Sequence, residues 1–167
     1  PNHTIIALGH DDLELCHPEC VARLVATNAD FVIHPAAYTN VDGCARDPEL
    51  AYRVNGLGTQ YVALACRQLG APLVYVSTNE VFDGLRTDGR AYLLDDIPAP
   101  GNPYGASKAA AECLATAAFA DEAASGSALG IARTAWLFGA PGRDFPSRML
   151  DAAERARAAG EPVRAVG

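Results

Sequence analysis

The sequence predicts an α/β fold in which helices cover a doubly wound, parallel β-sheet. Short apolar runs rich in β-branched residues alternate with longer helical patterns, as expected of strands joined by crossover helices. The run from Leu73 to Val76 is apolar at every position, which is typical of a central strand covered on both faces. The chain has 167 residues, half of them hydrophobic, enough to bury the core of one domain. We therefore expect a single domain over residues 1–167.

The elements follow from local patterns. Strands are expected near residues 4–8, 31–34, 73–77 and 129–136. The clearest helix begins at Asp47, an N-cap residue followed by Pro48, and ends at Gly70. Further helices are predicted for residues 18–27, 103–124 and 145–159. Residues 83–101 are rich in Gly, Asp and Pro without periodicity, so they predict a long loop, and long loops within domains are often functional.

Composition excludes several classes of function. The formal net charge of -7 leaves no basic surface for a phosphate backbone, so no nucleic-acid partner is expected. No apolar run approaches the roughly 20 residues that cross a bilayer, and the first residues lack the zones of a signal peptide. We expect a soluble, cytoplasmic protein with no membrane partner.

The five cysteines are scattered and form no Cys-x-x-Cys pair, which favours reduced thiols over a disulfide framework. Cys16, His17 and Cys20 could be metal ligands or, alternatively, residues of a helix start and its core. No second ligand pair follows them at zinc spacing, so no metal site is expected.

Tyr104 and Lys108 stand four residues apart at a predicted helix start, so both side chains lie on one face. A nearby ammonium stabilises a phenolate and lowers the tyrosine pKa, so that the phenol can exchange a proton with a substrate oxygen. The alternative is a tyrosine and a lysine on a solvated helix face.

Two hydroxyl residues, Ser77 and Thr78, end the predicted central strand, at the edge where open α/β sheets bind ligands. Strand-end capping is the alternative role. A hydroxyl at this position, followed by Tyr-x-x-x-Lys on the next helix, resembles the catalytic triad of the short-chain dehydrogenase/reductase family. The resemblance implies a Rossmann-like fold and assigns Thr78, Tyr104 and Lys108 to catalysis.

The resemblance narrows to the extended subgroup that acts on sugar nucleotides, and within it to the dTDP-4-dehydrorhamnose reductases. Four stretches carry it, in the order and spacing of that family, and they cover nearly the whole chain. They are Ala36 to Asp42 (AAYTNVD), Ser77 to Gly84 (STNEVFDG), Asp96 to Lys108 (DIPAPGNPYGASK) and Arg133 to Gly139 (RTAWLFG).

The resemblance implies that a nicotinamide cofactor, NADP or NAD, reduces the 4-keto group of a nucleotide-linked 4-keto-6-deoxy sugar. Tyr104 would donate the proton, Lys108 would hold the nicotinamide ribose, and Thr78 would bind the substrate oxygen. The remaining implied cofactor contacts are Glu14, Leu15, Ala36, Ala37 and Tyr38. The implied substrate contacts are Thr39, Val41, Asn79, Glu80 and Trp136, the last being alternatively a core residue.

The sequence also departs from the family pattern. His34 stands where the family usually has Asn, and Asn79-Glu80 replaces the usual Asp-Tyr, which bears on the identity of the sugar. The sequence contains no Gly-x-x-Gly-x-x-Gly turn, with which the family cradles the pyrophosphate. We therefore expect a first β-α unit before residue 1 and a C-terminal substrate domain after residue 167.

Two other functions stay open. A nucleotide-sugar epimerase or dehydratase could use the same triad, and Glu80 beside the hydroxyl favours this possibility. A non-catalytic, cofactor-binding regulatory subunit is the alternative from another class, since fold similarity does not guarantee activity. A homodimer is the expected assembly.

Overall fold

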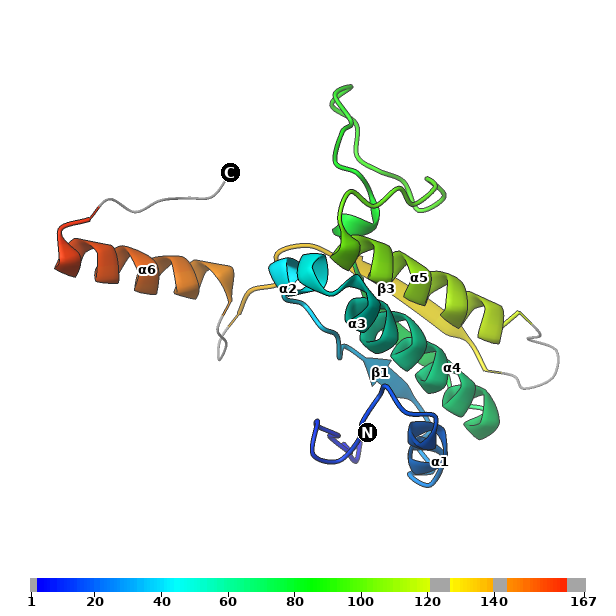
Figure 1. Cartoon of the computed structure of the whole chain (residues 1–167). Coiled ribbons are helices and arrows are strands. Elements are labelled where there is room, and N and C mark those ends of the chain that lie inside the picture. Colours follow the sequence, from blue (N-terminus) through cyan, green and yellow to red (C-terminus); the bar gives the residue numbers. More distant parts are fainter. Residues whose placement is uncertain (1–2, 121–126, 140–143, 162–167) are drawn as a thin grey trace. The chain divides into compact units, whose positions relative to one another are not determined.

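The computed structural model describes residues 3–120, 127–139 and 144–161. The chain forms two compact units, Pro1–Arg133 and Thr134–Gly167, which we describe separately (Figure 1). The sheet and the candidate site lie in the first unit.

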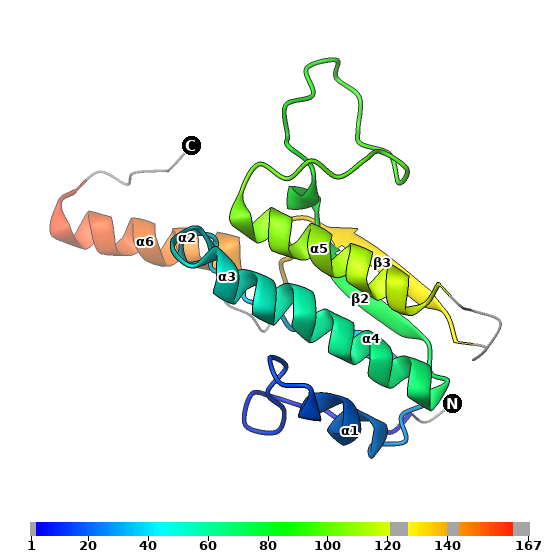
Figure 2. The ribbon, with the colours of Figure 1, turned by 45° about the vertical axis from the view of Figure 1, so that its right-hand side comes forward.

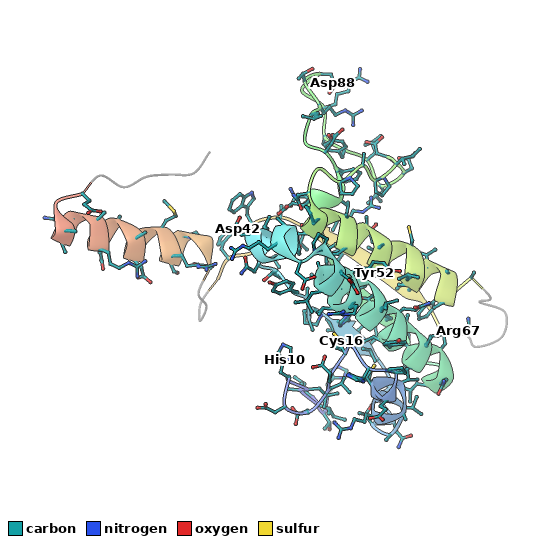
Figure 3. The ribbon with its side chains drawn as sticks, in the orientation of Figure 1. His10, Cys16, Asp42, Tyr52, Arg67 and Asp88 are labelled. Carbon is teal, nitrogen blue, oxygen red and sulfur yellow. The ribbon has the colours of Figure 1, made fainter. Side chains whose placement is uncertain are left out.

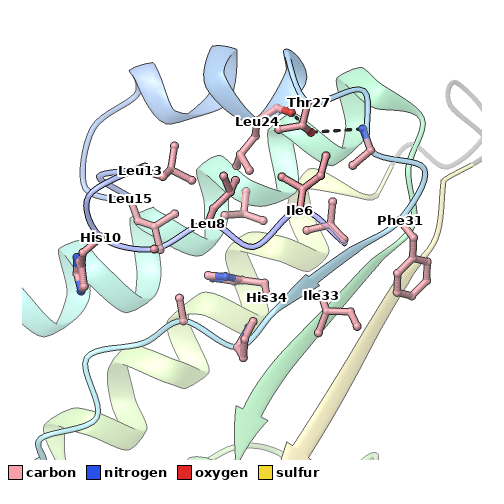
Figure 4. Close-up of a pocket in the computed structure, with 16 residues that line it drawn as sticks. Ile6, Leu8, His10, Leu13, Leu15, Leu24, Thr27, Phe31, Ile33 and His34 are labelled. Carbon is pink, nitrogen blue, oxygen red and sulfur yellow. Dashed lines mark hydrogen bonds between the residues drawn. The ribbon is translucent and has the colours of Figure 1, made fainter. Parts of the chain in front are cut away.

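The sheet contains β1 (Val32–His34), β2 (Leu73–Thr78) and β3 (Leu129–Thr134), in that spatial order. The parallel pairing of β1 with β2 sets Val32 opposite Leu73 and His34 opposite Tyr75. The arrows of β2 and β3 point the same way in Figure 4. The parallel sheet and three of the four predicted strands are therefore confirmed, with β2 at the centre.

Helices pack on one face of this sheet in the first unit, namely α1 (Glu19–Val25), α4 (Gly58–Leu69) and α5 (Pro103–Ala118) (Figure 2). Leu73 and Tyr75 of β2 are fully buried, whereas Val74 between them is half-buried. This alternation marks the covered face, because successive strand residues point to opposite faces. The core under the helices includes Leu13, Cys20, Leu24, Val62, Ala63, Cys66, Leu73, Ala115 and Phe119.

The helix expected between Asp47 and Gly70 is present but is built from three segments. It begins as α3 (Pro48–Ala51), with the Asp47 carboxylate accepting a hydrogen bond from the Leu50 amide at 2.9 Å. It continues as the π-helical turn η1 (Tyr52–Leu57) and then as α4. Gly70 ends it with φ of 68°, the left-handed conformation that glycine adopts without strain.

The sequence patterns missed the short helix α2 (Val41–Arg46), which Asn40 caps by accepting a hydrogen bond from the Gly43 amide at 2.9 Å. Helix α5 confirms the predicted start at residue 103 but ends at Ala118, so the helix predicted for residues 119–120 is wrong, and residues 121–124 lie outside the described residues. Residues 83–101 form the predicted loop, without a helix or strand.

The predicted strand at residues 4–8 is wrong. These residues pair with no strand, and Ile5 is 87 % exposed. The reason lies in the sheet: β1 pairs with β2 on one side only, and nothing in the described residues joins its other edge to residues 4–8. A β-branched run becomes a strand only where its backbone groups find a ladder partner.

The second unit contains helix α6 (Phe145–Ala159), which confirms the predicted helix at 145–159. The Asp144 carboxylate caps it by accepting a hydrogen bond from the Ser147 amide at 2.9 Å, and Gly160 ends it with φ of 69°. None of the described helices is both long and apolar enough to cross a membrane.

Candidate active site

The candidate site forms where β2 ends and α5 begins. Asn102 caps α5, its side-chain oxygen accepting a hydrogen bond from the Gly105 amide at 2.8 Å, so Tyr104 falls on the first helical turn. A Cβ atom on Gly105 would overlap the Glu80 carbonyl oxygen. Glycine at this position therefore lets the helix start approach the turn that follows β2, and this approach brings Tyr104 to Thr78.

Of the two hydroxyls at the end of β2, Thr78 belongs to the site. Its oxygen accepts a hydrogen bond from the Glu80 amide at 3.2 Å, which leaves the hydroxyl proton available for Tyr104 or a substrate oxygen. The Ser77 hydroxyl instead donates to the Glu112 carboxylate at 2.6 Å. Both hydroxyls therefore contact α5, Ser77 through Glu112 and Thr78 through Tyr104 near the start of the helix.

Lys108 is almost completely buried, with 2 % of its surface exposed. Its ammonium donates a hydrogen bond to the Val76 carbonyl oxygen at 2.8 Å and lies 4.3 Å from the centre of the Tyr75 ring. Burial lowers the pKa of Lys108 to about 8, and the Glu112 carboxylate opposes this change. The ammonium is thus held by a carbonyl dipole and an aromatic face.

The predicted lowering of the Tyr104 pKa is wrong for this arrangement. Burial raises the pKa of Tyr104 above its ordinary value, and the negative charge of Glu80 raises it further, while the hydrogen bond from Thr78 lowers it. The Lys108 ammonium is turned to the Val76 carbonyl oxygen and the Tyr75 ring instead. Tyr104 is therefore held in its protonated form, which suits a proton donor.

Sequence reasoning missed Asn55, a buried side chain in η1. Its amide oxygen accepts a hydrogen bond from the Tyr38 amide at 2.7 Å, and its amide nitrogen donates to the Ser107 hydroxyl at 2.8 Å. Asn55 therefore ties the segment after β1 to α5, next to Lys108. No sequence pattern marked Asn55, and the structure places it in a π-helical turn, a feature that is frequent at functional sites.

A partly buried ion pair lies next to the site, between β3 and α5. Arg133 at the end of β3 meets the Glu112 carboxylate of α5 at 2.7 Å, and its guanidinium lies 5.0 Å from the centre of the Phe82 ring. The same carboxylate accepts the Ser77 hydrogen bond. The ends of β2 and β3 are thereby joined to α5.

An apolar groove of about 360 Å³ runs along the open edge of β1. Figure 4 shows it between the segment that carries Ile6 and Leu8 and the strand that carries Ile33 and His34. Of the predicted cofactor residues, Leu15 and Ala36 line the groove, and Ala37 and Tyr38 follow directly along the chain. Glu14 is exposed, and its carboxylate accepts a hydrogen bond from the Cys16 amide.

These residues fit part of a nicotinamide dinucleotide. The small side chains of Ala36 and Ala37 allow close approach to the backbone, and the apolar wall suits an adenine ring. The buried Lys108 ammonium supplies a positive charge next to Tyr104. The sequence has no glycine-rich turn for the pyrophosphate.

The predicted substrate residues divide into two groups. Asn79 and Glu80 form the turn η2 (Asn79–Val81) next to Thr78, and Thr39 and Val41 are exposed at the start of α2. Trp136 lies in the second unit, with φ of 49°, so its contact with a sugar stays a prediction.

No group of three or more potential metal ligands gathers anywhere in the part of the chain that the structure describes. All five cysteines are free thiols. Figure 3 shows His10 and Cys16 on the N-terminal segment and Asp88 far from both of them, on the 83–101 loop.

A parallel sheet with a hydroxyl, a phenol and an ammonium gathered at the carboxyl end of its central strand defines the class of short-chain dehydrogenase/reductase proteins. Comparison with protein-family models agrees with that class and identifies a family within it. The model of the RmlD substrate binding domain matches residues 1–161, and the chain belongs to this family.

Curated relatives of the chain include dTDP-4-dehydrorhamnose reductase of Mycobacterium tuberculosis, with 38 % identity over 148 residues. That alignment covers 87 % of this chain and 46 % of the relative. The chain therefore spans about half the length of the curated relatives that it matches.

Solved structures with the same fold include two with bound cofactors. The dTDP-4-dehydrorhamnose reductase of Bacillus anthracis in complex with NADP is 36 % identical with a TM-score of 0.72, over 86 % of this chain and 48 % of that one. The UDP-glucose 4-epimerase of Thermus thermophilus in complex with NAD is 29 % identical with a TM-score of 0.74, over 91 % of this chain and 49 % of that one.

Proposed function

We propose that residues 1–167 form the NAD(P)-binding, Rossmann-like domain of a sugar-nucleotide reductase. The substrate is a nucleotide-linked 4-keto-6-deoxy sugar similar to dTDP-4-dehydrorhamnose, and its 4-keto group is reduced to a hydroxyl. The observation that carries this proposal is the convergence of Thr78, Tyr104 and Lys108 at the end of β2. The similarity to named dTDP-4-dehydrorhamnose reductases supports the substrate class.

The chemistry follows from the site. The bound nicotinamide supplies the hydride that reduces the carbonyl carbon. Tyr104, held in its protonated form, donates a proton to the carbonyl oxygen, and the Thr78 hydroxyl donates a hydrogen bond to the same oxygen as negative charge develops there. Lys108, already held by the Val76 carbonyl oxygen, has further ammonium protons for the nicotinamide ribose.

The other predicted contacts belong to the same proposal. Cofactor contacts come from Glu14, Leu15, Ala36, Ala37 and Tyr38, and substrate contacts from Thr39, Val41, Asn79 and Trp136. A reductase structure with NADP and an epimerase structure with NAD support either cofactor. A cytoplasmic location and a homodimer are also part of the proposal.

The test is the loss of nicotinamide absorbance when the whole protein is mixed with NADPH or NADH and a 4-keto-6-deoxy sugar nucleotide. Turnover with a 4-hydroxy product supports the proposal. Cofactor binding without turnover on any keto sugar nucleotide would instead favour the regulatory subunit. Calorimetry on residues 1–167 alone should show dinucleotide binding weaker than micromolar, because this sequence lacks the glycine-rich turn.

A nucleotide-sugar epimerase or dehydratase is the second candidate. The similarity to UDP-glucose 4-epimerase and the carboxylate of Glu80 near Tyr104 favour it. An epimerase interconverts two sugars without net consumption of the nicotinamide. Product analysis in the presence of NAD alone therefore separates this function from the reductase.

A further inference from the structure

Glu80 makes its side-chain contact with the start of α5. Its carboxylate accepts a hydrogen bond from the Asn102 amide nitrogen at 2.7 Å, and the Asn102 amide oxygen accepts from the Gly105 amide at 2.8 Å. One asparagine side chain therefore joins Glu80 to the first turn of the helix that carries Tyr104.

The backbone of Glu80 makes two further links. Its amide donates a hydrogen bond to the Thr78 hydroxyl oxygen at 3.2 Å, which fixes the rotamer of that side chain. Its carbonyl oxygen lies where a Cβ atom on Gly105 would be, so the turn and the helix are in direct contact. Glu80 thus contacts the catalytic hydroxyl on one side and the helix of the catalytic phenol on the other.

We propose that Glu80 is a positioning residue: through Asn102 it holds the first turn of α5, and with it Tyr104, against the Thr78 hydroxyl. This role replaces the direct substrate contact that the family pattern implies for residue 80. The effect of Glu80 on the reaction rate rests on the proposed reductase function, but its effect on the contact between Thr78 and Tyr104 does not.

The charge of Glu80 adds a second effect. The groups that face the Tyr104 phenol are Thr78 and Tyr75 of β2, Glu80 of η2 and Cys44 of α2, while Tyr38 packs beside it. Lys108, one turn along α5, directs its ammonium to the Val76 carbonyl oxygen. Glu80 is the carboxylate among these groups, and its negative charge favours the protonated phenol.

Four variants separate position from charge. Glu80→Gln keeps an acceptor for Asn102 but removes the charge, whereas Glu80→Ala removes both. Asn102→Asp keeps the helix cap, since Asp is a good N-cap residue, but cannot donate to Glu80. The control is Asp30→Asn, an exposed carboxylate before β1 and therefore at the opposite end of the parallel strands from Thr78.

The first readout is NMR of the full 167-residue chain, with the Tyr104 ring signals assigned by their loss in Tyr104→Phe. We expect the nuclear Overhauser effect between the Thr78 methyl group and the Tyr104 ring to weaken in Glu80→Ala and Asn102→Asp. It should persist in Glu80→Gln and Asp30→Asn. Tyr104 should titrate at lower pH in Glu80→Gln than in the wild type.

Retention of the Thr78–Tyr104 effect in both Glu80→Ala and Asn102→Asp would overturn the proposal, and so would its loss in Glu80→Gln. Circular dichroism identifies any variant that fails to fold. If Glu80→Ala does not fold, the comparison of the Thr78–Tyr104 effect in Glu80→Gln with that in Asn102→Asp tests the proposal. Because this readout needs no turnover, it decides the role of Glu80 even if the proposed reductase activity is not found.

Kinetics of the whole protein provide the second readout. Misplacing a reacting group by about 1 Å can cost roughly 10²-fold in rate, so Glu80→Ala and Asn102→Asp should lower kcat by up to that factor with little change in KM. Glu80→Gln should retain most of kcat at neutral pH. A rise in KM with unchanged kcat would instead show that Glu80 binds the substrate directly.

Discussion

Two regions of the sheet in the first unit differ in how completely their polar and apolar groups are partnered: the end of β2, called the closed side below, and the open edge of β1, called the open side. At the end of β2, Thr78, Tyr104 and Lys108 are buried, and hydrogen bonds and the Tyr75 ring hold them in place. Along the open edge of β1, Ile33 is 63 % exposed beside an apolar groove. The candidate proton-transfer site is therefore pre-organised by the first unit itself, whereas the edge proposed for the dinucleotide is not closed by the described residues.

This contrast has a physical basis. Each group of the proton-transfer site comes from β2 or α5, which pack on each other through the core. Pre-organised donors cost little reorganisation during a reaction, so a closed, rigid arrangement is an advantage there. The β1 edge exposes a row of backbone groups that only another extended segment can pair.

The largest expected effect is on the closed side. Tyr104→Phe should lower turnover of a keto sugar nucleotide by roughly 10²- to 10⁴-fold, the range for loss of a general acid. Cofactor binding should survive, because the ring still fills its place in the cluster with Cys44 and Ala51. Steady-state kinetics and calorimetry measure the two quantities, and unchanged turnover would remove Tyr104 from the mechanism.

The acid stability of the chain should depend on His34, whose ring nitrogen lies 3.1 Å from the Thr59 hydroxyl. Burial lowers the pKa of His34 to about 4, with a smaller contribution from the charge of Lys108. As the pH falls from 6.5 to 4, the His34 imidazole therefore becomes protonated in the unfolded chain but stays neutral in the folded chain. The free energy of unfolding should fall by about 3 kcal/mol over that window because of this residue.

Urea unfolding at pH 7 and pH 4 measures this effect. His34→Asn should lose about 3 kcal/mol less than the wild type between the two pH values, which is the contribution of His34. His10→Asn, a change at an exposed histidine, is the control and should behave as the wild type does. An equal loss in His34→Asn and the wild type would show that His34 is protonated inside the fold.

Thr78→Ala should reduce turnover by about 10²-fold, the loss associated with removal of one donor to a developing oxyanion. Thr78→Ser keeps the hydroxyl and should retain most of the activity. The matched change Ser77→Ala, next to it on β2, should leave the chemistry intact, because the Ser77 hydroxyl donates to Glu112. Equal losses in Thr78→Ala and Ser77→Ala would contradict this division of roles.

The same contrast explains what the sequence could predict. The apolar run of β2 and the Asn102 cap of α5 are local signals, and both elements are where the sequence places them. Residues 4–8 have an equally good strand pattern, but strand formation depends on a neighbouring ladder that no local pattern reports.

The site was predictable in its residue types but not in its contacts. The sequence shows two hydroxyls at the end of β2, but only the packing of α5 shows that Ser77 meets Glu112 and Thr78 meets Tyr104. The turn η1 keeps nearly the apolar spacing of an α-helix, so the sequence predicted one continuous helix and missed the role of Asn55. The direction of the Lys108 ammonium also depends on tertiary contacts.

The smallest expected effect lies on the open side. Ile33→Lys in the 167-residue chain should change the free energy of unfolding by no more than about 0.5 kcal/mol, because a side chain that is 63 % exposed loses little by becoming polar. A lysine at an open sheet edge also opposes edge-to-edge association, so light scattering at high concentration should decrease. The matched change on the covered face, Leu73→Ala, removes a fully buried side chain and should cost about 2–5 kcal/mol in the same urea experiment. A loss for Ile33→Lys comparable to that for Leu73→Ala would show that the β1 edge is already covered in solution, and the contrast between the two sides would then fail.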